Sequence, residues 1–129
     1  MSPHEQAEML LRKAAADEAL VDKVFNDPAI ADELVGYHCQ QAMEKLLKAR
    51  LVELRVNYPK THNLLTLVEL LEDQGKRLPA DLADLDRLTP YATIYRYEDL
   101  PQLDVFDRKS AREFIRRLRT WVENELKNQ

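Results

Sequence analysis

Polar side chains that could bind a phosphate are concentrated on one side of a predicted helix in the first half of the chain. The residues that recur there at intervals of three and four are Tyr37, Gln41, Glu44, Lys45 and Lys48. Such intervals bring side chains together on one helix face. Two lysines beside an amide could therefore bind an anionic ligand in one shared crevice. The alternative is an exposed polar stripe, stabilised slightly by a Glu44–Lys48 ion pair.

A second candidate is a group of aromatic residues around one arginine late in the chain. It consists of Tyr91, Tyr95, Arg96 and Tyr97. Tyrosine rings can stack on bases and an arginine can hold a phosphate, so this group could bind a nucleotide or RNA. The alternative is a packing role, in which the tyrosines anchor the loop before the last helix.

The sequence predicts neither a metal site nor a bound cofactor. His38, Cys39 and His62 do not have metal-ligand spacing, and the single cysteine excludes a Cys-x-x-Cys pair. No glycine-rich phosphate loop can form, because the chain has only two glycines and they are far apart. Cys39 follows an apolar stripe, which predicts an inert core residue.

These candidates must be positioned by helices. Apolar residues recur with a helical period, prolines stand at the breaks, and no stretch alternates as a strand would. The helices are expected at residues 3–25, 28–56, 61–75, 79–95 and 107–127. Short connections favour antiparallel neighbours. The prediction is an all-α, up-and-down bundle of four main helices plus a shorter fifth helix at 79–95.

Local signals set the expected helix ends. The residues Ser2, Pro3 and Glu5 form a capping box at the first helix. Asp27 is expected to cap the second helix ahead of Pro28, and Thr61 to cap the third. Gly75 is expected to end the third helix.

Composition places the chain among globular proteins. Its 129 residues fit a single domain over 1–129, with 45% apolar and 33% charged residues. One cysteine, no secretory leader and no long apolar run indicate the cytoplasm and no membrane contact. The net charge of −4 argues against a general nucleic-acid coat. Basic residues are nevertheless concentrated at 108–119. They could form either a solvated face that balances the acidic segment 69–107 or a binding strip.

Three motifs resemble the prokaryotic HEPN family. Residues 40–49 read QQAMEKLLKA, similar to that family's QQAxEKxxKA run. Residues 61–64 read THNL, like its third-helix opening. Residues 88–97 read LTPYATIYRY and are similar to its LTxY…ARY segment. The motifs occur in the family's order, and the helical plan covers essentially the whole chain.

The resemblance implies a helical bundle that forms homodimers and partners a minimal nucleotidyltransferase, frequently as a toxin–antitoxin pair. It also implies an ATP-like nucleotide or RNA as ligand. The residues that would bind this ligand are Gln41, Lys45, Lys48, His62, Tyr91, Arg96 and Tyr97. One of the tyrosines could instead accept a nucleotidyl group from the partner enzyme.

Many members of the family cleave RNA without metal, through an Arg-x4–6-His motif. A histidine can transfer a proton near neutral pH, and an arginine can stabilise developing phosphate charge. No histidine follows His62, so Arg96 lacks the histidine expected after it. Arg55 and His62 have suitable spacing, but Pro59 interrupts the helix between them. The alternatives to the binding partner are therefore an endoribonuclease using Arg55 and His62, or Arg96 with a distant histidine, and a non-catalytic dimerisation domain.

Overall fold

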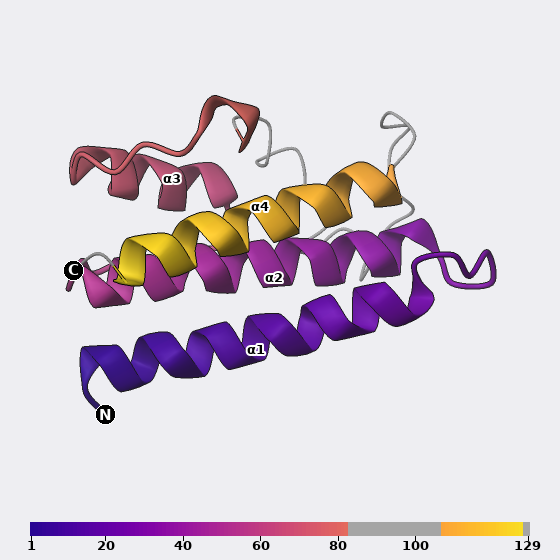
Figure 1. The fold of residues 1–129 in the computed structure, drawn as a ribbon, viewed down its shortest axis with the longest axis horizontal. Helices are drawn as coiled ribbons and strands as arrows, with labels where there is room; N and C mark the ends of the chain where they lie inside the picture. Colours follow the sequence, from indigo (N-terminus) through magenta and orange to yellow (C-terminus); the bar gives the residue numbers. More distant parts are fainter. Residues whose placement is uncertain (83–106, 128–129) are drawn as a thin grey trace.

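The computed structural model describes residues 1–82 and 107–127, and these residues form helices joined by loops (Figure 1). The elements are α1 (Pro3–Val24), α2 (Asp32–Glu53), α3 (Leu64–Asp73), the 3-10 turn η1 (Ala80–Leu82) and α4 (Arg108–Lys127). No strand occurs in the described part of the chain, which confirms the all-α prediction for it. The fifth helix is not seen there: its first residues form η1, and residues 83–95 lie outside the described ranges.

Helix α2 is the centre of the core. It packs extensively against α1, α4 and α3, whereas α1 and α4 meet over a shorter stretch. Apolar residues are therefore buried on several sides of α2, as the wide apolar arc predicted. The fully buried side chains of α2 include Val35, Cys39, Met43, Leu46, Leu47 and Leu51. Burial of Cys39 raises the pKa of its thiol to about 12, so the thiol stays protonated and unreactive.

The helices do not alternate in direction throughout. Helices α1 and α2 are antiparallel, as expected. Helix α4 runs in the same direction as α2. Two ion pairs show this: Arg108 near the start of α4 pairs with Asp32, and Glu125 near its end pairs with Arg50. Helix α3 also runs with α2, and its end approaches the end of α4 through a Lys76–Glu125 contact (Figure 1).

The loop between α2 and α3 explains this departure from an up-and-down bundle. Residues 54–63 contain no helix, and the main-chain oxygen of His62 accepts a hydrogen bond from Gln40, in the middle of α2. Ten extended residues span up to roughly 33 Å, which is ample for the return. The chain thus runs back along α2 before α3 begins. This return of the chain places His62 beside Gln40 and Glu44 of α2.

Side-chain caps define two helix starts. The capping box of Ser2 and Glu5 is present as predicted. Helix α3 is capped by Asn63, whose side-chain oxygen accepts from Leu65 and Thr66, and not by Thr61. The Thr61 hydroxyl instead accepts the Asn63 amide in the preceding turn.

The start of α2 also differs from the prediction. The Asp27 carboxylate accepts the amide of Ala29 within a turn, and α2 begins only at Asp32. Ala31 occupies the cap position, where it provides no side-chain hydrogen bond. Because the Asp27 carboxylate bonds within the turn around Pro28, Asp27 does not cap α2.

Helices α2 and α3 end in the same backbone motif but with different residues. In each, two amides beyond the end bond back to oxygens of the last turn. These bonds are Arg55 to Val52 and Val56 to Leu51 after α2, and Gly75 to Glu72 and Lys76 to Leu71 after α3. This motif needs one residue with positive φ, usually glycine. Gly75 fills it after α3 with φ 75°, as predicted, whereas Arg55 fills it after α2 with φ 61°.

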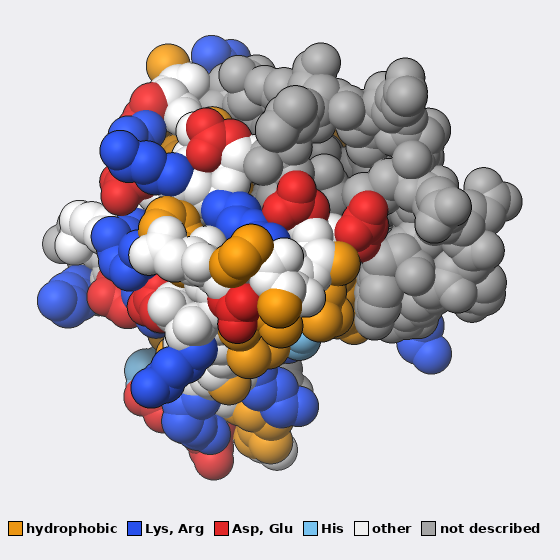
Figure 2. Space-filling view, turned by 90° about the vertical axis from the view of Figure 1, so that its right-hand side faces the viewer, with side chains coloured by type: hydrophobic (Ala, Val, Ile, Leu, Met, Phe, Trp, Pro, Cys, Tyr) orange, Lys and Arg blue, Asp and Glu red, His pale blue; other side chains and the backbone are white. Residues whose placement is uncertain are grey.

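The basic strip of α4 is mostly engaged within the molecule. Arg119 bonds both carboxylate oxygens of Glu18, and Arg112 pairs with Asp22 at 2.7 Å. Arg108 pairs with Asp32 and donates to main-chain oxygens of the 24–30 turn. Within the described ranges, the strip thus pairs mainly with acids of α1 and α2, and Arg117 pairs with Asp81 of the acidic segment. At the end where α4 begins, basic and acidic side chains are interspersed (Figure 2).

Candidate functional site

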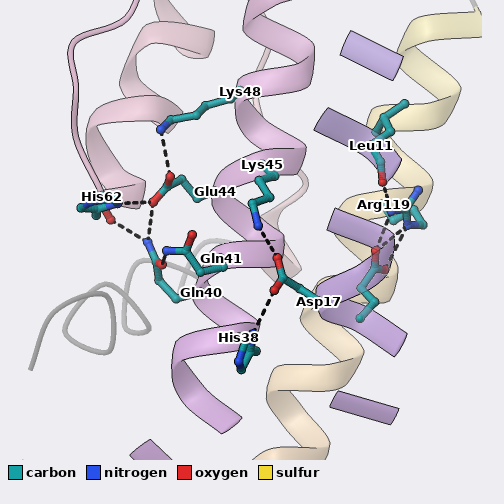
Figure 3. Close-up of polar contacts among 11 residues, drawn as sticks. Leu11, Asp17, His38, Gln40, Gln41, Glu44, Lys45, Lys48, His62 and Arg119 are labelled. Atoms are coloured by element: carbon teal, nitrogen blue, oxygen red, sulfur yellow. Dashed lines mark hydrogen bonds and ion pairs between the residues drawn. The ribbon is translucent and has the colours of Figure 1, made fainter. Parts of the chain in front are cut away.

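The Glu44 carboxylate joins two of the sequence motifs at one point. Its Oε1 lies 2.8 Å from Nδ1 of His62, and its Oε2 accepts from Lys48 at 2.9 Å. Gln40 donates to Glu44 Oε1 at 3.1 Å and to the main-chain oxygen of His62 at 2.8 Å. Gln41 donates in turn to the Gln40 side-chain oxygen. These five residues are called the Glu44 cluster (Figure 3).

Burial differs sharply within the Glu44 cluster. The side chain of Glu44 is 6% exposed, that of Lys48 15% and that of His62 53%. Burial alone would raise the pKa of Glu44, but hydrogen bonds from Lys48, His62 and Gln40 outweigh it and lower that pKa. Glu44 is therefore a buried, ionised anchor, and His62 is the part of the cluster that solvent reaches most.

The Glu44 contact also fixes the tautomer of His62. An ionised carboxylate only accepts hydrogen bonds, so Nδ1 of His62 must carry the proton. In the neutral ring, Nε2 is then the basic nitrogen. The Lys48 ammonium has three donors, of which one is used by Glu44. It also lies 5.3 Å from the centroid of the Tyr58 ring.

A second cluster connects α2 to α1. The Asp17 carboxylate pairs with Nζ of Lys45 through one oxygen and lies 2.9 Å from Nδ1 of His38 through the other. The Asp17 side chain is 12% exposed, and those of Lys45 and His38 are both 24% exposed. These three residues are called the Asp17 cluster.

The structure divides the crevice that helical spacing predicted. Lys48 and Gln41 belong to the Glu44 cluster, whereas Lys45 is turned towards Asp17 of α1 (Figure 3). The clusters share no hydrogen bond within the described ranges. Lys45 and Lys48 thus lie on one side of α2, but different carboxylates hold them.

Of the remaining predicted site residues, only Arg55 lies in the described ranges, and it is not brought to the Glu44 cluster. Arg55 is exposed just beyond α2, whose end lies roughly 13 Å along the helix axis from Glu44 at about 1.5 Å per residue. The loop that separates Arg55 from His62 in sequence also separates them in space. Tyr91, Arg96 and Tyr97 lie outside the described residues.

Sequence reasoning did not name three residues as part of the site: Asp17 and Gln40, which belong to the clusters, and Tyr58, which lies beside Lys48. Asp17 lies between Ala14 and Val21, and both of these are buried on the core side of α1. Gln40 is itself fully buried on α2. A polar residue at a core position is the signal that could have found both, since such a group needs a partner inside the fold. Tyr58 carried no such signal, because its loop could not be placed.

The comparisons with known proteins fit this architecture. The model of the HEPN domain matches residues 7–126, so the chain belongs to the HEPN domain family. No curated protein and no solved structure gives a significant match. Within the described residues no helix is long and apolar enough to cross a membrane, and no three potential metal ligands are grouped.

Proposed function

We propose that this HEPN protein is the nucleotide- or RNA-binding partner of a minimal nucleotidyltransferase, as part of a toxin–antitoxin pair. The observation that carries the proposal is the contact of His62 and Lys48 with one buried carboxylate, Glu44. Two motifs that are distant in the sequence thereby meet in one polar cluster, in which His62 is half exposed. The proposed ligand is an ATP-like nucleotide or a segment of RNA.

The Glu44 cluster has the parts needed to hold a phosphate. Lys48 can keep its bond to Glu44 and still donate to a phosphate oxygen. In its protonated form, His62 can also donate from Nε2. Tyr58, beside Lys48, offers a ring on which a base could stack. Lys45 would contact the phosphate from beside the Glu44 cluster, once its ion pair with Asp17 is broken.

The proposed dimer and partner enzyme would complete a site of which this chain supplies only one side. A homodimer, or the nucleotidyltransferase itself, would cover the half-exposed side of the cluster and complete the site. Light scattering after size exclusion should give twice the chain mass of 15.1 kDa. A nucleotidyltransferase encoded beside this chain should co-purify with it.

Calorimetric titration of the purified protein with ATP and with a short RNA tests the ligand surface. Lys48→Ala should weaken binding about tenfold, as expected for one lost charged contact of about 1.4 kcal/mol. The matched control is Lys23→Ala, an exposed lysine at the end of α1. Binding that is unchanged in Lys48→Ala would remove the Glu44 cluster from the proposal.

One observation favours a second function, metal-independent cleavage of RNA. His62 is oriented by a carboxylate through Nδ1 and is half exposed, the arrangement of a general base. It would take the proton of a ribose 2′-hydroxyl, whose oxygen then attacks the adjacent phosphorus and displaces the 5′-oxygen of the next nucleotide. The proton would return from His62 to that leaving oxygen while a cation stabilises the phosphate charge. Cleavage in EDTA that is lost in His62→Ala would establish this function. Cleavage that persists in the variant would exclude His62 as its base.

A further inference from the structure

A groove outside both clusters lies between α4 and η1. It has a volume of about 480 Å³, within the range of small-ligand sites. Its apolar walls come from Pro79, Leu82 and Trp121. Two arginines, Arg116 and Arg117, stand at the same groove. The groove therefore combines a flat aromatic surface with positive charge.

The arginines of α4 divide into two groups by how firmly they are held. Arg108, Arg112 and Arg119 each make an ion pair no longer than 2.9 Å. Among the described residues, Arg116 comes no closer than 3.5 Å to a carboxylate, and Arg117 no closer than 3.4 Å. Strong charge-assisted hydrogen bonds are shorter, about 2.7–2.9 Å.

The loosely paired arginines are also the exposed ones. The side chains of Arg116 and Arg117 are 52% and 49% exposed. The Arg117–Asp81 pair links α4 to η1 beside the groove. An exposed pair of this kind contributes about 0–1 kcal/mol, so an anionic ligand can replace Asp81 at little cost.

We propose that this groove binds a planar aromatic group that carries a phosphate. The ring packs against Trp121, and the phosphate is held by Arg116 and Arg117. Base stacking on an aromatic side chain is worth about 1–3 kcal/mol, and arginine binds phosphate through two parallel hydrogen bonds. Thr120 and Asn124, also at the groove, supply polar contacts for the rim of the ring. The site is separate from the Glu44 cluster.

The single tryptophan of the chain provides the test. Its indole N–H gives one signal in a nitrogen-15 NMR spectrum of the intact protein. Adenosine monophosphate should shift this signal saturably, whereas adenosine alone and inorganic phosphate alone should bind at least about tenfold more weakly. A short adenine RNA distinguishes the source: tighter binding than the mononucleotide indicates a strand, and weaker binding a free nucleotide.

Matched variants make the test specific. Arg117→Gln should abolish the saturable shift, whereas Arg112→Gln, on the same helix but outside the groove, should retain it. The rest of the spectrum reports whether each variant is folded. No indole shift with any probe, or an equal shift in Arg117→Gln, would overturn the proposal. Because Lys48→Ala leaves this groove intact, failure here is distinguishable from failure at the Glu44 cluster.

Discussion

At the scale of the residue, one buried carboxylate organises the candidate site. Glu44 accepts hydrogen bonds from three side chains, and its negative charge is what makes their arrangement stable. A charged hydrogen bond of this kind contributes about 1.5–3 kcal/mol, more than an exposed ion pair does. The position of His62 therefore depends on the ionisation of Glu44.

The lowered pKa of Glu44 predicts a specific loss of stability in acid. A carboxyl group whose pKa is lower in the folded state stabilises the fold fully above its unfolded pKa, about 4.3. That contribution is lost as the pH falls through the lower, folded-state pKa. The free energy of unfolding should thus fall less between neutral and acid pH in Glu44→Gln than in the wild type. Parallel denaturant titrations measure this, and equal losses would contradict the assigned role.

Arg55 is a residue whose backbone conformation suits glycine better. It has φ 61°, and its equivalent after α3 is Gly75. Left-handed geometry costs about 1–2 kcal/mol for a residue with a Cβ, so Arg55→Gly should stabilise the protein by about 1 kcal/mol. Denaturant unfolding measures the gain. An unchanged or lower stability would show that the Arg55 side chain contributes contacts that offset the strain.

At the scale of the element, helix α4 is fastened to the rest of the bundle by Arg108. Its guanidinium bonds Asp32 and four main-chain oxygens of the turn between α1 and α2. The oxygens of Val24 and Asp27 also accept main-chain amides, but Arg108→Ala removes a charged donor from all four. The variant should therefore lower the free energy of unfolding by about 2–3 kcal/mol. Arg112→Ala removes a half-exposed pair with Asp22 and should cost at most about 1 kcal/mol. Equal effects of the two variants would contradict this ranking.

The sequence predicted the helices better than their arrangement. Apolar periodicity located all four described helices and the central role of α2, because burial of an apolar face dominates both. Periodicity contains no information on how the loop 54–63 runs, and that loop decides the direction of α3. The start of α2 was misplaced because Asp27 can serve a turn as well as a helix cap.

The same limit applies to the candidate site. Helical spacing predicted that Lys45 and Lys48 share one side of α2, because that relation is local. It could not show that Asp17, 28 residues from Lys45 in the sequence, holds one of them. Nor could it show that Glu44 reaches His62 as well as Lys48, since that contact depends on the returning loop.

At the scale of the whole molecule, the bundle has two polar clusters and one groove at separate places around a central helix. The Glu44 cluster lies where α2 meets the segment before α3, the Asp17 cluster links α2 to α1, and the groove beside Trp121 lies between α4 and η1. The proposed ligand surface could therefore bind its ligand while the core of the bundle remains intact. The proposed partner enzyme would have to approach from the half-exposed side of the Glu44 cluster.

The most direct test of the central claim is to map where ATP binds by NMR chemical shifts in the intact protein. The proposed function predicts that the largest shifts fall on the ring of His62 and the amides around Glu44 and Lys48. The Lys48→Ala variant should lose these shifts and retain its fold. Saturable ATP shifts confined to other surfaces, or none at any concentration, would contradict the assignment of ligand binding to the Glu44 cluster.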